Sequence, residues 1–139
     1  MLGPLIMRSM MRRTQAATVE SKDIEALKKM WADDVTLTFL GQPAIAGKPA
    51  VEAWYRSWFD GLAEVRERPR NFAFVRPYAL GFTNTVLWES TGEFVFQDGR
   101  KAVVQEVTAI DFERGKAKAI RIYVADPDGE DLFLGVEGV

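Results

Sequence analysis

The sequence predicts an α+β fold in which three helices in the N-terminal half pack on one face of a mainly antiparallel sheet. Apolar residues recur at helical spacing as far as Leu62, and from about Val65 their period changes from 3.6 residues to 2. Short connections that contain glycine separate the later apolar stretches, as in consecutive hairpins. The chain has 139 residues, so we expect a single domain over residues 1–139, with residues 127–139 as a loose tail.

Three segments carry the helical pattern. The first follows Pro4 and has a loose apolar stripe that ends at Ala17. The second begins at Asp23, whose side chain suits the N-cap, and its apolar residues extend to Trp31. The third has proline in its first turn and presents one continuous apolar face, made by Val51, Trp54, Tyr55, Trp58, Phe59 and Leu62.

The predicted strands lie between and after these helices. Val35 to Phe39 alternates with threonine and precedes a turn at Gly41. Four longer strands are expected over residues 65–80, 82–96, 101–112 and 116–125. Their connections contain Gly81, Gly99 and Gly115, and each is short enough for a hairpin.

The composition excludes several kinds of chemistry. The chain has no histidine and no cysteine, which removes imidazole bases, thiolate nucleophiles and the usual zinc or haem ligands. Chemistry must then use carboxylates, Tyr, Lys, Arg, Ser or Thr, and we expect no metal and no cofactor. A net charge of −2 offers no basic field for nucleic acid, and no apolar run is long enough to span a membrane. The arginine-bearing residues 1–19 are expected to form an ordered helix rather than a targeting peptide, which places the protein in the cytoplasm.

Several short motifs resemble a known family. They are ADDVTLTF, GKPAVEAWYRSWF, a DGR turn, an RGK turn and a closing IRIYV strand, in that order. Over about residues 5–126 the chain resembles the SnoaL-like branch of the NTF2-like superfamily. The resemblance implies a strongly curved sheet wrapped around its helices as a cone, an apolar pocket inside it, and commonly a dimer across the sheet. Members include polyketide cyclases, epoxide hydrolases, ketosteroid isomerases, dehydratases and proteins that only bind.

The catalytic motifs of these relatives are incomplete in this chain. Phe39 stands where the resemblance to ketosteroid isomerases implies an aspartate, and Thr108 stands where cyclases have histidine. Many relatives end their last strand as R-x-Y-x-D, and the matching positions here are Arg121, Tyr123 and Ala125. The inherited acid or base is therefore missing.

The remaining polar residues suggest a different site. The strand alternation that places Thr108 in the family's pocket also places Glu106 there, and we expect Arg121 and Tyr123 to face them from the next strand. A desolvated carboxylate has a raised pKa that suits a general acid or base. We therefore predict that Glu106, Tyr123 and Arg121 polarise or deprotonate a carbonyl-bearing molecule. The alternative is a buried Glu–Arg pair, or side chains on the outer face of the sheet.

A set of buried-type residues is expected to line the pocket for an apolar ligand: Trp31, Phe39, Trp54, Trp58, Trp88 and Thr108. The alternative is that these aromatic residues form plain core. On the strand of Trp88, we expect the tryptophan to point inward and Glu89 to face solvent. The overall expectation is a homodimeric protein that binds an apolar oxygenated small molecule, with isomerase, cyclase or hydrolase activity through carboxylate and tyrosine acid–base chemistry as the favoured role. A ligand-binding protein without turnover and a dimeric assembly module are the alternatives.

Two charged clusters have simpler interpretations. Arg66, Arg68 and Arg70 alternate on one strand face, and with Glu64 and Glu67 they are expected to protect an exposed sheet edge rather than bind an anionic ligand. The neighbouring Asp33 and Asp34 are expected to hydrogen-bond a turn rather than hold a metal ion, because adjacent carboxylates point apart.

Overall fold

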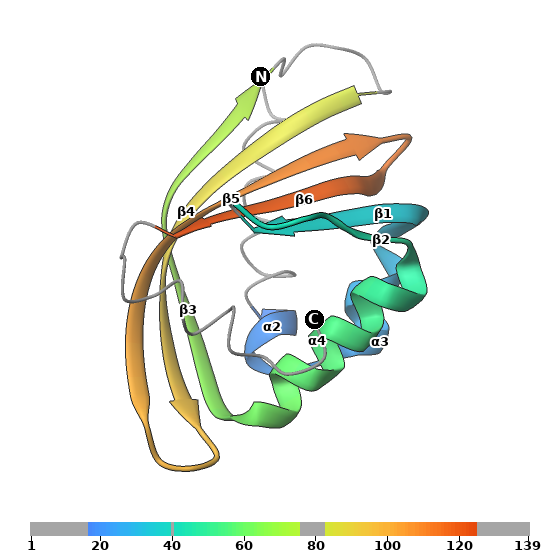
Figure 1. The fold of residues 1–139 in the computed structure, drawn as a ribbon. Helices are drawn as coiled ribbons and strands as arrows, with labels where there is room; N and C mark the ends of the chain where they lie inside the picture. Colours follow the sequence, from blue (N-terminus) through green and yellow to red (C-terminus); the bar gives the residue numbers. More distant parts are fainter. Residues whose placement is uncertain (1–16, 40, 76–82, 125–139) are drawn as a thin grey trace.

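A curved sheet that wraps around helices on its concave side forms the body of the protein (Figure 1). The computed structural model describes residues 17–39, 41–75 and 83–124. Within these residues there are three helices and one six-stranded sheet, which confirms the predicted α+β class and the curved sheet that the family resemblance implied.

The sheet is antiparallel except for one pair of strands. Its strands are β1 (Trp31–Phe39), β2 (Ile45–Ala46), β3 (Leu62–Val75), β4 (Thr83–Phe96), β5 (Lys101–Glu113) and β6 (Lys116–Val124). They lie in the order β2-β1-β6-β5-β4-β3, with β1 and β6 parallel. The short strand β2 was not predicted from the sequence, and it pairs with β1 through Ile45 and Ala46. Strand β3 is an edge strand, as its arginines suggested.

Three helices cover the concave face: α2 (Ala17–Glu20), α3 (Ile24–Lys29) and α4 (Lys48–Gly61). Most of the first predicted helix lies outside the described residues. The predicted N-cap is confirmed, since Asp23 Oδ1 accepts a hydrogen bond from the Ala26 amide at 3.0 Å. The expected helical position of Trp31 is wrong: α3 closes when the Met30 amide bonds to the Leu27 carbonyl, and Trp31 then pairs with Ala117 in the sheet.

Two of the predicted hairpins are confirmed. Between β5 and β6, Arg114 and Gly115 have φ of 51° and 77°, the backbone that a tight two-residue turn needs. Between β4 and β5, Gly99 has φ of 88° and its amide bonds to the Phe96 carbonyl at 3.0 Å. The connection that contains Gly81 lies outside the described residues.

An aromatic cluster on α4 fills the space between helix and sheet. Trp54 and Trp58 stack with their ring centroids 5.6 Å apart, and the Trp58 ring meets Phe94 of β4 edge-on at 5.5 Å. The Phe94 ring lies against Gly92, where a Cβ atom would come within 2.5 Å of it. Gly92 therefore leaves room for a ring that joins β4 to α4.

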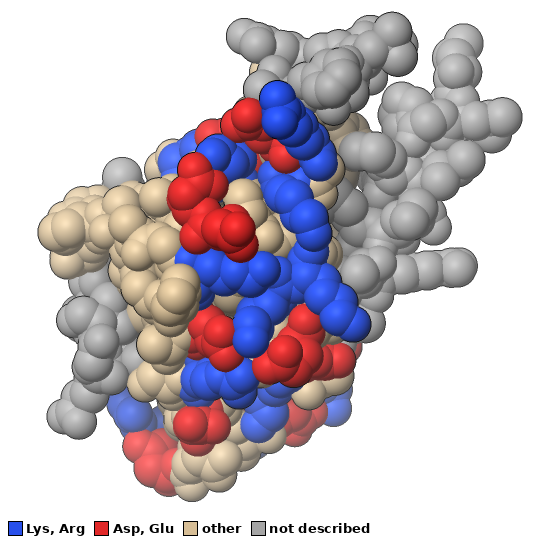
Figure 2. All heavy atoms as spheres, turned by 90° about the vertical axis from the view of Figure 1, so that its right-hand side faces the viewer, with Lys and Arg blue, Asp and Glu red and all other residues tan. Residues whose placement is uncertain are grey.

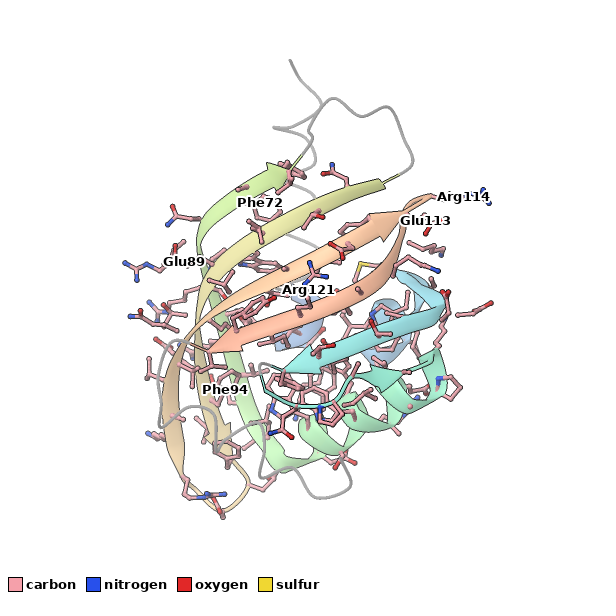
Figure 3. All side chains as sticks on the ribbon, turned by 45° about the horizontal axis from the view of Figure 1, so that its top comes forward. Phe72, Glu89, Phe94, Glu113, Arg114 and Arg121 are labelled. Atoms are coloured by element: carbon pink, nitrogen blue, oxygen red, sulfur yellow. The ribbon has the colours of Figure 1, made fainter. Side chains whose placement is uncertain are left out.

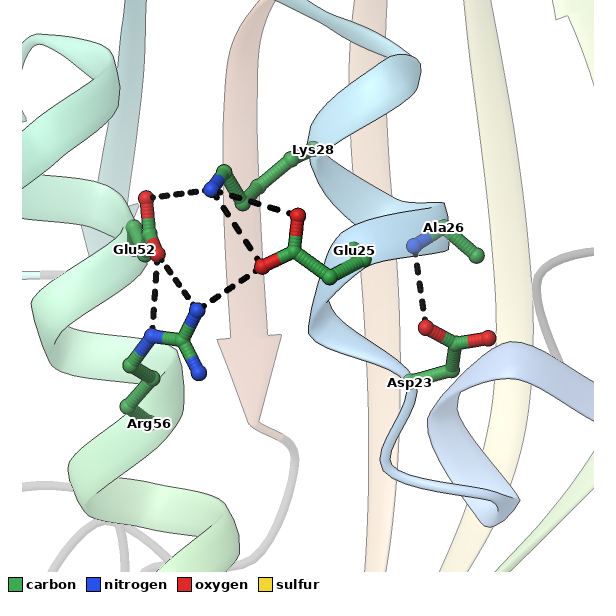
Figure 4. Close-up of polar contacts among 6 residues, drawn as sticks. All are labelled: Asp23, Glu25, Ala26, Lys28, Glu52 and Arg56. Carbon is green, nitrogen blue, oxygen red and sulfur yellow. Dashed lines mark hydrogen bonds and ion pairs between the residues drawn. The ribbon is translucent and has the colours of Figure 1, made fainter.

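Ion pairs connect α3 to α4 on the outside of the helices. Arg56 Nη2 bonds to both Glu52 and Glu25, at 2.7 and 2.9 Å, and Lys28 Nζ lies 3.0 Å from Glu52 (Figure 4). Acidic and basic side chains are similarly interspersed on the face that Figure 2 shows. None of the described helices is long and apolar enough to cross a membrane.

Candidate functional site

Two carboxyl groups, those of the buried Glu106 and the half-buried Glu67, lie on the inner face of the sheet, where β3, β4 and β5 run side by side. Ser90 pairs with Glu106 across β4 and β5, and Gly92 pairs with Glu67 across β4 and β3. Paired residues share a face of the sheet, so these side chains point towards the helices. Ser90 is 2% exposed and Glu106 is 7% exposed, and the Ser90 hydroxyl donates to Glu106 Oε1 at 3.3 Å.

Each of the two carboxyl groups affects the pKa of the other. Burial raises the pKa of Glu106 well above its usual value, and the nearby charge of Glu67 raises it further. Burial also raises the pKa of Glu67, although hydrogen bonds from Ser90 and Glu106 oppose that change. The protonated form is therefore favoured more strongly at Glu106 than at Glu67. The pair offers one acidic and one basic oxygen in the same place.

Two polar residues of the helices, Tyr55 of α4 and Glu20 of α2, interact electrostatically with this pair. Burial raises the pKa of Tyr55 on α4, and the charges of Glu106 and Glu67 add to this, so Tyr55 remains a neutral phenol. Glu20 of α2 accepts a hydrogen bond from the Glu67 amide at 3.0 Å, and its charge also favours the protonated form of Glu67. These contacts place the pair between the sheet and two helices.

Aromatic side chains adjoin the pair. Trp88 lies two residues before Ser90 on the same face of β4, is 4% exposed, and packs against Phe72 of β3 with centroids 6.2 Å apart. Phe94 continues this face in the other direction (Figure 3). The indole Nε1 of Trp88 is buried and has no hydrogen-bond partner within residues 17–39, 41–75 and 83–124. Apolar walls with a few polar groups are typical of small-molecule sites.

Glu106 does point inward, but the structure does not bring Arg121 and Tyr123 to it. Cross-strand partners share a face, and the inner-face partners of Glu106 and Thr108 on β6 are Val124 and Ile122. Arg121 and Tyr123 therefore lie on the outer face. The expectation that they face Glu106 has to be corrected, because it rested on the spacing within β6 without the register against β5.

On the outer face Arg121 has its own partner. Its guanidinium makes two hydrogen bonds to Asp111, at 2.5 and 3.0 Å, and the Thr85 hydroxyl donates to the same carboxylate at 2.8 Å. The guanidinium lowers the pKa of Asp111, so the pair stays ionised. Tyr123 is 38% exposed on this face.

The residues expected to bind a ligand fall into two groups. Trp31, Phe39, Trp54 and Trp58 are buried in the aromatic cluster between α4 and the sheet. Trp88 and Thr108 are paired across β4 and β5, next to the carboxyl pair. Trp88 points inward as expected, whereas Glu89 lies on the side of the sheet away from the helices and accepts a hydrogen bond from Asn71 (Figure 3). Their binding role remains a prediction.

Glu67 is the site residue that the sequence reasoning missed. It was expected to protect the sheet edge with its charge, and that is wrong because its side chain points inward. Its neighbours Arg66 and Arg68 are exposed on the outer face and pair with Glu64 at 2.8 Å and Glu93 at 3.2 Å. The available signal was their alternation, since the residue between two outward arginines on a strand must point inward.

No acidic cluster suited to a metal ion is found in residues 17–39, 41–75 and 83–124. Asp33 and Asp34 are exposed, and both lie within β1 rather than in a turn. Asp34 forms an ion pair with Lys118 of β6. This cation lowers the pKa of Asp34.

Comparisons with known proteins agree with this architecture. The model of the SnoaL-like domain matches residues 12–120, and the chain belongs to that family. A search of curated protein sequences finds no match.

Similar solved structures share the fold. One is a candidate aromatic ring hydroxylase from Novosphingobium aromaticivorans, with 20% identity, a TM-score of 0.74 and 90% of each chain covered. A type 2 hexachlorocyclohexane dehydrochlorinase (LinA) has 14% identity and a TM-score of 0.73, with 90% of this chain and 89% of that chain covered. A candidate dehydratase of the NTF2-like family from Streptomyces avermitilis has 14% identity and a TM-score of 0.71, with 85% and 94% covered. At these identities the likeness defines the NTF2-like fold and not an activity.

Proposed function

We propose that this protein binds an apolar, oxygenated small molecule on the inner face of its sheet and moves a proton on it. The observation that carries the proposal is the pair of Glu67 and Glu106 on the inner face beside aromatic walls, where burial raises the pKa of both carboxyl groups and that of Glu106 more strongly. Buried pairs of this kind are typical of general acid–base sites.

The proposed step is a tautomerisation that needs no redox partner. A C–H bond next to a carbonyl breaks, and its proton passes to the Glu67 carboxylate. The carbonyl oxygen takes the proton that Glu106 held, so an O–H bond forms and the electron pair of the C–H bond becomes the new C=C bond. The pair ends with one proton, as it began. Return of the proton at another carbon would complete an isomerisation.

The similarity to a dehydrochlorinase and a candidate dehydratase is compatible with this chemistry, because loss of a proton from carbon is a common part of eliminations. The simpler candidate function is ligand binding without turnover. The ion pair of Arg121 with Asp111 leaves the catalytic proposal to Glu67 and Glu106, with Ser90 as a hydrogen-bonding neighbour and Tyr55 as a neutral phenol nearby.

Hydrogen exchange on a simple ketone tests the proposal without knowledge of the natural ligand. β-Tetralone is a neutral two-ring ketone whose C–H bonds beside the carbonyl exchange in D₂O. We expect the protein to accelerate this exchange over buffer, and Glu106→Gln and Glu67→Gln each to reduce the acceleration by about 100-fold or more, the usual contribution of a general acid or base. NMR of the ketone measures the rate.

The matched control is Glu89→Gln, which changes a glutamate on the opposite face of the neighbouring strand. This variant should exchange the ketone at the wild-type rate. Exchange at the buffer rate with wild-type protein, or an equal loss in the control, would contradict the proposed acid–base role.

We further propose that the outer face of the sheet pairs with a second copy of the chain. Large apolar side chains are exposed there, including Val103 at 62% and Tyr123 at 38%. Burial of such side chains is the main stabilising contribution in homodimers. The cytoplasmic location remains a prediction from the sequence.

A further inference from the structure

The most informative unused group near the carboxyl pair is the indole N–H of Trp88. This group is buried, and no hydrogen-bond acceptor from the described part of the chain reaches it. An indole N–H can only donate a hydrogen bond, and a buried donor without an acceptor lowers the stability of the protein by about 1–3 kcal/mol. Because native structures rarely leave such groups unmet, an unpartnered donor beside a candidate site indicates an acceptor that arrives with the ligand.

The position of Trp88 relative to the pair limits the size of that ligand. Trp88 pairs with Thr108 across β4 and β5, and Ser90 pairs with Glu106 one step further along. Trp88 and Glu106 are therefore diagonal neighbours on one face of the sheet, about 7–8 Å apart between their backbones. One or two fused six-membered rings span such a distance.

The charges around the pair limit the ligand in a second way. The charged neighbours that act on Glu67 and Glu106 are acidic, namely Glu20 and the two members themselves, and no described lysine or arginine acts on either carboxyl group. The arginines next to Glu67 in the sequence, Arg66 and Arg68, lie on the outer face in ion pairs with Glu64 and Glu93. An anionic ligand would meet repulsion with no cation to balance it.

We propose that Trp88 is a specificity-determining residue that donates its indole N–H to an oxygen of an uncharged ring compound, such as a phenol or a cyclic ketone. This inference rests on the proposed function, since it names the class of ligand for the same site. Phe72 packs against the Trp88 ring, with the ring centroids 6.2 Å apart.

Three probes with one ring skeleton test the inference: β-naphthol, β-naphthoate and naphthalene. The first has a neutral oxygen, the second an anionic group and the third no polar atom. We expect β-naphthol to bind about tenfold or more tightly than either of the others, the effect of about 1.4 kcal/mol. Calorimetry measures the three affinities, and Trp88→Phe should reduce the preference for β-naphthol over naphthalene to about one.

A second measurement does not depend on any variant that binds poorly. In ¹⁵N-labelled protein the indole resonance that is absent in Trp88→Phe belongs to Trp88, and it should shift when β-naphthol is added but not when naphthalene is added. The control Glu89→Gln, whose side chain lies on the other face of β4, should retain the full preference.

The failures of the two proposals are distinguishable. Equal affinities for the three probes, tightest binding of β-naphthoate, a lack of binding by all three, or an unmoved Trp88 resonance would each overturn the role of Trp88. None of these results depends on ketone exchange. Loss of exchange in Glu106→Gln with an unchanged preference for β-naphthol would instead support both proposals.

Discussion

At the scale of single residues, the most consequential group in the interior of this protein is the carboxyl group of Glu106, whose pKa is raised by burial. Among the described residues, the charged group that acts on Glu106 is Glu67, a second carboxyl group rather than a cation. Buried carboxyl groups without a cation stay protonated well above their usual pKa. This state also makes the stability of the protein depend on pH.

The folded protein holds the proton of Glu106 more tightly than the unfolded chain does, since burial raises the folded-state pKa. The stabilisation that this proton contributes is therefore fully present below the unfolded pKa of about 4.3, and it is lost as the pH rises through the higher folded pKa. For one proton, the free energy of unfolding falls by at most about 1.4 kcal/mol per pH unit. We expect Glu106→Gln to flatten this slope, which urea unfolding between about pH 5 and pH 9 measures.

This pH range separates the effect from that of the ion-paired acids. Arg121 lowers the pKa of Asp111 and Lys118 lowers the pKa of Asp34, so the contributions of these acids are lost only as the pH falls through their lowered values. Equal slopes for wild type and Glu106→Gln would contradict a raised pKa of Glu106 in the folded protein.

Sequence patterns predicted the inward position of Glu106 but not its partner. Alternation along β5 was sufficient to place Glu106 inside, whereas the companion depended on neighbouring strands. The register of β5 against β6 puts Val124, not Tyr123, beside Glu106. The register of β3 against β4 shifts between Pro69 and Asn71, and such irregularities are set by three-dimensional packing.

At the scale of elements, the short helix α3 depends on its first residue and on its contacts with α4. It has only six residues, too few to be stable without tertiary contacts. Asp23 satisfies one free amide of its first turn, and the ion pairs of Lys28 and Arg56 connect it to α4 (Figure 4).

We expect Asp23→Ala to lower the free energy of unfolding by about 1 kcal/mol, the usual cost of losing an N-cap. The control Asp33→Ala removes an exposed aspartate of β1 and should change stability by less than about 0.5 kcal/mol. Urea midpoints measure both. A similar loss in the two variants would indicate a general effect of lost negative charge instead of capping.

Long elements were predictable and short ones were not. Helix α4 and strands β4 to β6 follow clear periods of 3.6 and 2 residues, and their sequence limits agree closely with the structure. Strand β2 has two residues and forms only because β1 offers Thr36 and Leu37 as partners. Trp31 continued the apolar spacing of α3, but its pairing with Ala117 assigns it to the sheet.

At the scale of the whole molecule, the two faces of the sheet have different surroundings. The inner face is covered by helices, whereas Val103 and Tyr123 remain exposed on the outer face. A sheet face with exposed apolar side chains is a typical site of association with another chain.

We expect the protein to sediment as a dimer of twice 15.6 kDa and Val103→Glu to shift it towards the monomer, because a charge would be buried without a partner. The control Ala53→Glu adds the same charge on the exposed side of α4 and should stay dimeric. A wild-type monomer, or dissociation of both variants, would argue against this interface. Analytical ultracentrifugation makes the measurement.

The parallel pairing of β1 with β6 also constrains the order of folding during synthesis. Thr36 is made early, but its partner Ala119 belongs to the last strand of the sheet. The first helices and β1 therefore leave the ribosome long before the surface that covers them exists, while β4, β5 and β6 can each pair with the strand made just before. Completion of the sheet is thus a late event, and until then Leu37 and Phe39 have no partner strand on the β6 side.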